Sequence, residues 1–311
     1  MTQGGGLRSP KPKWFTSRSM RRERRFRSGD FMRQNTTIAG AAVAVFLATA
    51  AFAQTPQAKM GRVGCPHCIN DGSAISRWLQ KADELHAALK PNEALVELLK
   101  VLDRDPRNAE ALSKIARVYI DFGDMIPEAT PDWETKRLKQ YQAAEQYARR
   151  AVKADPNLAW GYFYVAASLG SIAAVSPVAK QIDLAGEIRG SVEKTLELDP
   201  QNGFAHHLYG VWHRKMAEIG KTKRVLASVF FGRSPPHGSV EKSIEYLKKA
   251  VSLNSTVIVS RLELARSYIT VENWSSARNL LVSIRDLPPQ FSDDPGYKQK
   301  AEQLIEEIKE R

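Results

Sequence analysis

The chain has 311 residues, 43% of them hydrophobic and 26% charged, which is enough apolar material for a packed core and excludes an intrinsically disordered protein. Its net charge of +12 is concentrated at the front, because residues 1–36 hold ten basic and two acidic side chains and residues 37–53 hold no charge. The rest of the sequence lacks the concentrated basic patch that nucleic-acid binding requires, so we exclude nucleic acid as a partner.

The first element that the sequence predicts is a targeting segment over residues 1–53. A basic stretch precedes an uncharged run that ends in Ala51-Phe52-Ala53, an order typical of a signal peptide with a small-x-small cleavage site. The segment therefore predicts an exported protein, periplasmic or secreted, cleaved after Ala53. An uncleaved membrane anchor is the alternative, although a span needs about 20 strongly apolar residues. Met32 is an alternative start that would leave a compact basic n-region.

A linker over residues 54–72 follows and contains the two cysteines, Cys65 and Cys68, in the tetrapeptide Cys-Pro-His-Cys. In the oxidising compartment that export implies, such a pair predicts a disulfide. The tetrapeptide also resembles the active site of periplasmic disulfide oxidoreductases of the thioredoxin class, so thiol redox chemistry is the alternative. That chemistry normally sits in a strand-to-helix turn, and the neighbouring sequence predicts no strand.

Residues 73–311 predict an all-α domain, because apolar residues recur with the helical period and no alternating strand pattern is present. Helix stops recur at Pro106, Pro156, Pro200, Ser255 and Pro289. The stops end units that fit the tetratricopeptide repeat, whose period is about 34 residues. We therefore expect a helix-turn-helix solenoid of about five repeats with a C-terminal capping helix. The units are predicted over residues 75–108, 109–156, 157–200, 201–255 and 256–289, with the cap over residues 294–311.

The register of the repeats rests on a small residue at the eighth position of each unit. These residues are Ala82, Ala116, Ala166, Gly210 and Ala265. The two antiparallel helices of a unit cross at this position, and a larger side chain would push their backbones apart. An irregular helical bundle rich in alanine, which is the alternative, would not keep one register through every unit.

Three units are longer than the repeat period, and their insertions fall between the first and second helix, along one edge of the stack. The third insertion, which includes residues 221–233, contains an apolar run with basic residues at its flanks. Its candidate lipid-contact residues are Val225, Leu226, Val229, Phe230 and Phe231. We expect either an extra helix that packs on the stack or a flap that contacts a lipid or another apolar ligand.

The predicted partner-binding site is a groove lined by the first helices of the units, as the resemblance to tetratricopeptide stacks implies. From the third unit onward these positions are aromatic or aliphatic, with arginines that could bind a carboxylate or phosphate. The groove residues are Arg117, Trp160, Phe163, Phe204, His207, Val211, Arg214, Leu262, Arg266 and Ile269. Strong curvature or a folded-over insertion would instead bury the same side chains as core.

Catalysis has no candidate residues in the sequence. His206, His207 and His213 lack a nearby carboxylate that would complete a metal site, so we interpret them as packed histidines. No Ser/His/Asp, HExxH or phosphate-loop pattern occurs. We therefore predict a protein that is not an enzyme and that uses no metal or cofactor.

The C-terminal part of the sequence resembles the regulator of microtubule dynamics family. The segments that carry the resemblance are HLYGVWHRKMAEI (207–219), SVFFGRSPPHGSVEKSIEYLKKAVSLN (228–254), LARSYITVENWSSARNLL (264–281) and LPPQFSDDPGYKQKAEQLIEEI (287–308). The resemblance implies a helical tetratricopeptide-like domain, association with microtubules and organelle membranes, and phospholipid binding in one branch of the family.

The expected function is a non-catalytic scaffold that holds a protein or peptide segment in the groove of the helical array. A phospholipid-binding or transfer protein is the first alternative, with membrane contact through an uncleaved leader or through residues 221–233. A thiol redox protein that uses the Cys-Pro-His-Cys segment is the second alternative.

Overall fold

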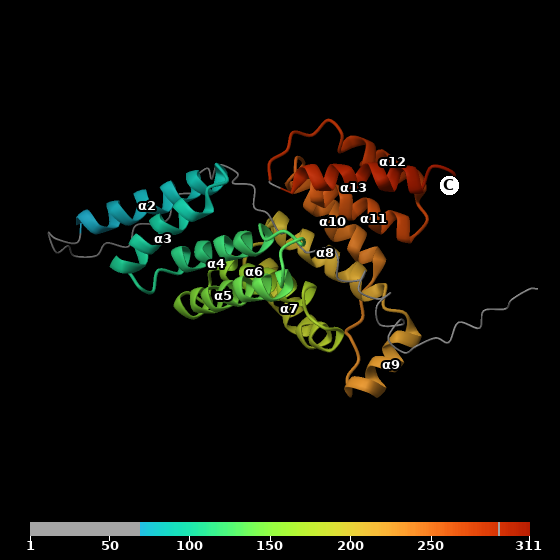
Figure 1. Ribbon diagram of the computed structural model, residues 1–311, viewed down its shortest axis with the longest axis horizontal. Coiled ribbons are helices and arrows are strands. Elements are labelled where there is room, and N and C mark those ends of the chain that lie inside the picture. The colour runs from blue at the N-terminus through green and yellow to red at the C-terminus, as the bar shows by residue number, and fades with distance from the viewer. Residues whose placement is uncertain (1–68, 292) are drawn as a thin grey trace, which may run out of the picture. The chain divides into compact units, whose positions relative to one another are not determined.

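The computed structural model describes residues 69–291 and 293–311, and all the regular structure in this part of the chain is helical. Figure 1 shows the arrangement. The helices are α2 (Ile69–Ala87), α3 (Pro91–Arg104), α4 (Ala109–Asp124), α5 (Trp133–Ala154), α6 (Ala159–Ala174), α7 (Val178–Leu198), α8 (Gly203–Ala217), α9 (Lys221–Phe231), α10 (Val240–Leu253), α11 (Ile258–Thr270), α12 (Trp274–Ser283) and α13 (Asp294–Glu307). The prediction of an all-α fold is confirmed.

The helices pack in consecutive pairs. α2 packs on α3, α4 on α5, α6 on α7, α8 on α10 and α11 on α12, and neighbouring pairs contact each other in chain order. α13 packs on both α11 and α12 and so covers the last pair, as a capping helix does. This is the architecture of a tetratricopeptide-like helical solenoid. We call α2, α4, α6, α8 and α11 the first helices of the pairs.

The boundaries of the helix pairs follow from local hydrogen bonding. Asp199 ends α7, and its carboxylate accepts a hydrogen bond from the backbone N–H of Gln201 at 3.1 Å. Asn202 then begins α8, because its side-chain oxygen accepts from the backbone N–H of Ala205 at 2.9 Å. Asp105 and Asn108 play the same two roles between α3 and α4. Aspartate followed by asparagine therefore turns the chain at these two boundaries.

The small residues of the repeat register lie where the two helices of a pair cross. Ala82, Ala116, Ala166 and Ala265 have no exposed surface. Gly210 makes the closest approach, because a Cβ atom added to it would lie 2.5 Å from Leu247 Cγ on α10. The predicted reason for small residues at these positions is thus visible in the packing of α8 on α10.

Replacing Gly210 with alanine is expected to lower the free energy of unfolding by about 1–3 kcal/mol, because α8 and α10 must move apart to admit the methyl group. Gly190→Ala in α7 is the matched control, since nothing lies within 4 Å of the added atom and alanine favours a helix over glycine. Urea unfolding of both variants measures the difference. Equal stability of the two variants would contradict the close crossing.

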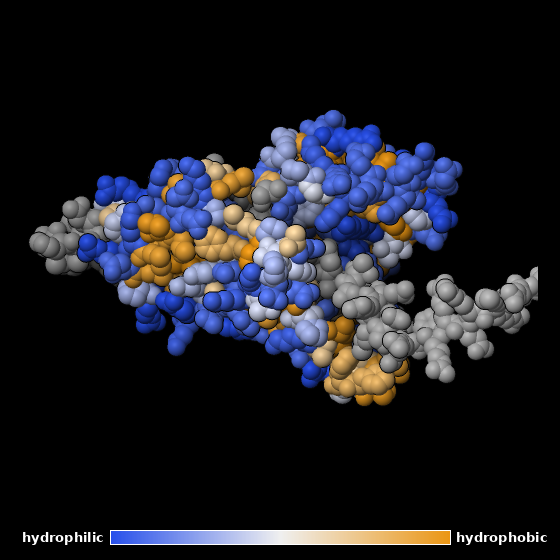
Figure 2. Space-filling view, in the orientation of Figure 1, coloured by the Kyte–Doolittle hydropathy of each residue, from blue (hydrophilic) through white to orange (hydrophobic). Residues whose placement is uncertain are grey.

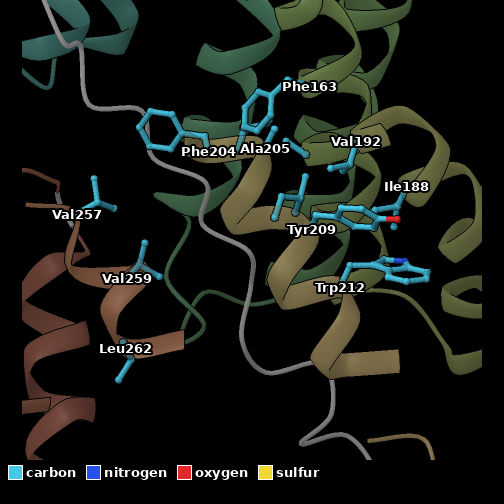
Figure 3. Packing of buried hydrophobic residues seen from close by; sticks show 14 of the residues in the cluster. Phe163, Ile188, Val192, Phe204, Ala205, Tyr209, Trp212, Val257, Val259 and Leu262 are labelled. Atoms are coloured by element: carbon cyan, nitrogen blue, oxygen red, sulfur yellow. The ribbon is translucent and has the colours of Figure 1, made fainter. Parts of the chain in front are cut away.

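The core runs through the helix pairs as clusters of apolar side chains. The largest cluster joins residues from α4 to α13 and includes Phe163, Phe204, Trp212 and Leu262. Figure 3 shows part of it, with Phe204 beside Phe163 and with Tyr209 and Trp212 on the side of α8 that faces Ile188. Among the described residues, none of the helices combines the length and apolarity that a membrane span needs.

Several predictions concern residues outside the described part of the chain. These are the leader over residues 1–53 with its cleavage site after Ala53, the alternative start at Met32, and the pair Cys65 and Cys68. The disulfide and the thiol redox alternative therefore stay predictions.

Candidate functional site

The predicted groove residues divide into two groups by burial. Trp160, Arg266 and Ile269 are half-buried and reach the surface. The other seven are at most 8% exposed, so they belong to the interior and do not line an open surface. They are Arg117, Phe163, Phe204, His207, Val211, Arg214 and Leu262. Most of the predicted groove residues are therefore part of the core, which was the alternative that the sequence left open.

Trp160 is the partly exposed member of an aromatic cluster on α6 and α8. Its ring centroid lies 5.2 Å from that of Phe163 in an edge-to-face arrangement, 5.8 Å from that of Tyr164 and 6.4 Å from that of Phe204. Phe163 and Tyr164 are buried and hold the indole in place from below. A partly exposed aromatic side chain that is packed against other rings loses little entropy on binding, which is typical of contact residues in protein interfaces.

The groove arginines are paired within the chain. Arg117 donates to Asp83 Oδ1 at 3.1 Å. Arg214 donates to Glu218 at 2.7 Å and to Glu263, and Arg266 donates to the second oxygen of Glu263 at 2.6 Å. Each guanidinium already has an anionic partner within the chain. Binding of a ligand carboxylate or phosphate by these arginines stays a prediction.

Glu263 is the centre of a buried ion-pair cluster that joins α8 to α11. Burial opposes ionisation of its carboxyl group, but Arg214 and Arg266 overcome this effect and lower the pKa of Glu263 to about 2. The carboxylate is therefore charged at neutral pH. Lys215 belongs to the same region, and burial beside Arg214 lowers its pKa. These groups fix the position of α8 relative to α11.

The three histidines of α8 are packed side chains. His207 lies 3.1 Å from Ser260 Oγ through Nδ1, and burial lowers its pKa to about 4. The ring of His213 is parallel to that of Tyr246 at 5.6 Å, and burial lowers its pKa to about 4 as well. His206 lies 3.0 Å from the carbonyl oxygen of Pro200. No group of three or more histidine, cysteine, aspartate or glutamate side chains in the described residues could hold a metal ion.

The first helices of the first two pairs carry a polar network, of which only Arg117 was predicted from the sequence as a groove residue. His86 Nε2 and Asp121 Oδ2 lie 2.8 Å apart and are buried between α2 and α4. Asp83 accepts from Lys114 at 2.5 Å and from Arg117. Polar and charged side chains of α2 and α4 are therefore paired across the two helices. Spacing along a helix gives no signal for such pairs, since the partners lie more than 30 residues apart.

The third insertion forms the helix α9, and its apolar side chains face solvent. Val225, Val229 and Phe230 are 61%, 73% and 74% exposed, and Leu226 is 36% exposed. Phe231 is half-buried. Figure 2 shows this apolar patch at the lower right, where Figure 1 places α9. The expected extra helix is present, but among the described helices it has no close packing partner.

The family model described as "Regulator of microtubule dynamics protein 1-3" matches residues 78–309. Regulator of microtubule dynamics protein 1 of Pongo abelii is 26% identical over 244 residues, which cover 78% of this chain and 76% of the relative. The protein of the same name from Bos taurus is 26% identical over 232 residues, covering 74% and 71% of the two chains. Regulator of microtubule dynamics protein 3 of Rattus norvegicus is 24% identical, covering 74% of this chain and 48% of the relative.

A solved structure supports the fold. A thermophilic tetratricopeptide protein of Thermus thermophilus, TTC0263, superposes with a TM-score of 0.52 at 16% identity, covering 74% of this chain and 100% of that chain. At this identity the likeness shows the fold alone. It agrees with the solenoid of helix pairs described above.

The prediction of export is wrong. The matching relatives are animal proteins named for microtubule dynamics, and microtubules are filaments of the cell interior, whereas the sequence predicted a periplasmic or secreted protein. The error has a physical origin. Several kinds of targeting segment combine many basic residues, few acidic residues and a neighbouring apolar run. Composition alone therefore does not determine the compartment.

Proposed function

This chain belongs to the regulator of microtubule dynamics family, and we propose that it is a non-catalytic scaffold whose first helices bind a segment of a partner protein at Trp160. A tetratricopeptide-like solenoid is a protein-binding architecture, because its repeats present one continuous surface made of corresponding helices. The observation that carries the proposal is the accessible indole of Trp160 on a buried aromatic base.

The proposed contact residues are the groove positions that reach the surface, namely Trp160, Arg266 and Ile269. Trp160 supplies apolar area and an indole N–H for a backbone carbonyl of the partner. Arg266 keeps donors beyond the one that Glu263 accepts. We assign the buried groove residues a structural role, which is to hold these side chains in position. The names of the relatives make microtubules the first partner to assay.

Replacing Trp160 with alanine is expected to weaken binding of the partner at least about tenfold, as loss of a central aromatic contact does. Trp274→Ala is the matched control, because Trp274 is also half-buried but lies on the second helix of its pair. The assay is cosedimentation of each variant with microtubules, with affinity capture from cell extract as the wider search. Thermal melts of the two variants show whether their folds are equally stable.

The proposal fails if the two variants bind the same partners with the same affinity. It also fails if Trp274→Ala alone loses binding, because the contact surface would then lie on the second helices.

The lipid-transfer alternative has less support. It needs a cation in the groove for the lipid phosphate, and the groove arginines are paired with Asp83, Glu218 and Glu263. We therefore do not propose a lipid-carrying groove.

A further inference from the structure

The helix α3 exposes two apolar side chains on the face opposite its core contacts. Val96 is 53% exposed and Leu99 is 46% exposed, and Figure 2 shows apolar side chains at the left, where Figure 1 places α3. The exposed residues of α5 and α10, which are also second helices of their pairs, are all polar or charged. Contact with solvent alone therefore does not account for apolar residues at this place on α3.

Two polar side chains continue the apolar stripe of α3 at its ends. Asn92 lies four residues before Val96, and Asp103 lies four residues after Leu99, so all four side chains share one side of the helix. Asn92 and Asp103 are exposed, and neither side chain forms a hydrogen bond or an ion pair with another described residue. The stripe therefore contains, in chain order, an amide, two apolar groups and a carboxylate.

The charges beside this stripe change sign along α3. Glu93 lies in the first turn of the helix and Arg104 in the last turn. Both are exposed, and neither forms an ion pair with another described residue, whereas Lys100 pairs with Glu97. The acidic and the basic end of the stripe are about 16 Å apart along the helix axis. A second α3 that runs in the opposite direction would match both ends.

We propose that α3 is the contact surface between two copies of this chain, which meet in antiparallel orientation about a two-fold axis between Val96 and Leu99. Val96 of one copy contacts Leu99 of the other, and the two-fold axis makes this contact occur twice. One face of a helix of 14 residues is smaller than the roughly 800 Å² that each partner buries in a stable complex. We therefore expect a weak dimer, with a dissociation constant of about 10 µM to 1 mM.

The polar groups of α3 select the antiparallel orientation. Asn92 of one copy lies opposite Asp103 of the other and donates a side-chain N–H to that carboxylate. Glu93 of one copy meets Arg104 of the other. Parallel copies would instead place Glu93 against Glu93 and Arg104 against Arg104, and like charges in contact oppose association. The dimer contact is independent of the partner segment proposed at Trp160.

The test is sedimentation velocity of the full chain over a series of concentrations. Leu99→Asp places a charge at the centre of the contact. Val282→Asp on α12 is the matched control, because Val282 is 41% exposed and also lies on the second helix of its pair. Glu93→Arg and Arg104→Glu are measured singly and together. Thermal melts of all variants show whether their folds are equally stable.

We expect the unaltered chain to dimerise and Leu99→Asp to weaken the dimer at least about tenfold, while Val282→Asp leaves it unchanged. Each single charge reversal should also weaken the dimer. The double variant Glu93→Arg with Arg104→Glu should restore it, because opposite charges then meet again. Trp160→Ala should dimerise like the unaltered chain.

The proposal is overturned if the full chain stays monomeric up to about 1 mM. It is also overturned if Leu99→Asp and Val282→Asp associate alike, because association would then use another surface. A double variant that dimerises no better than the single charge reversals would likewise contradict it, because the two copies would then not be antiparallel.

Discussion

Replacing Glu263 with glutamine should lower the free energy of unfolding by about 3–5 kcal/mol, because it removes a carboxylate that two arginines share in a buried cluster. Arg214 is 4% exposed, so its charge would stay buried with the partly exposed Glu218 as its remaining partner. Urea unfolding at neutral pH measures the loss. The control is Glu302→Gln, which breaks an exposed pair with Arg285 and should cost far less.

The same variant should change the pH dependence of stability. The pKa of Glu263 falls from 4.5 to about 2 in the folded chain, so the carboxylate stabilises the fold above the unfolded pKa, and this contribution is lost as pH falls from 4.5 toward 2. The stability difference between the unaltered chain and Glu263→Gln should shrink over that window. A difference that stays constant through the window would show that the charge of Glu263 does not join α8 to α11.

Replacing Phe163 with alanine should also cost about 3–5 kcal/mol of unfolding free energy, because the side chain has no exposed surface and the cavity left behind adds to the lost burial. Phe163 also supports the ring of Trp160. We therefore expect the variant to weaken partner binding even under conditions in which it stays folded.

Phe230→Ala is the matched control for Phe163→Ala. Phe230 is 74% exposed on α9, and a change at such a position should stay within about 0.5 kcal/mol of the unaltered chain. Calorimetric melts of the two variants give the comparison. If the two variants have the same melting temperature, Phe163 does not stabilise the fold through the aromatic cluster that contacts Trp160.

The fold could be predicted from the sequence because its signals are local and repeated. Ala82, Ala116, Ala166, Gly210 and Ala265 mark the helix crossings, and the structure buries the four alanines and presses Gly210 against α10. At two turns between pairs, aspartate and asparagine form the boundary through local hydrogen bonds, such as the one from the Ala205 N–H to Asn202. Such bonds join residues a few positions apart, so a single sequence contains the information.

The accessibility of the groove could not be predicted, because it depends on contacts between distant residues. Arg214 and Glu263 are 49 residues apart, and Arg117 and Asp83 are 34 apart. A repeat register places each of these side chains on a first helix, but it does not show that a carboxylate on the neighbouring pair will bind it. The register placed these residues on the first helices and overestimated how many of their side chains reach the surface.

The third insertion shows the same limit. Its composition indicated an apolar helix with basic flanks, and α9 is that helix. The direction of its apolar face depends on Arg224, whose acceptors are carbonyl oxygens before and after α9. Every residue has a backbone carbonyl, so the sequence does not indicate which carbonyl groups an arginine will bind. Residue types alone therefore could not decide between the packed helix and the lipid-contacting flap.

The central claim is that a partner segment contacts the first helices at Trp160. The most direct measurement places a photo-crosslinking phenylalanine analogue at position 160 in the full chain, illuminates cells, and identifies the joined peptide by mass spectrometry. A second chain carries the analogue at position 274. The scaffold proposal predicts that position 160 gives one recurrent crosslinked segment and that position 274 does not. Equal crosslinking at both positions, or no crosslink at position 160, would contradict it.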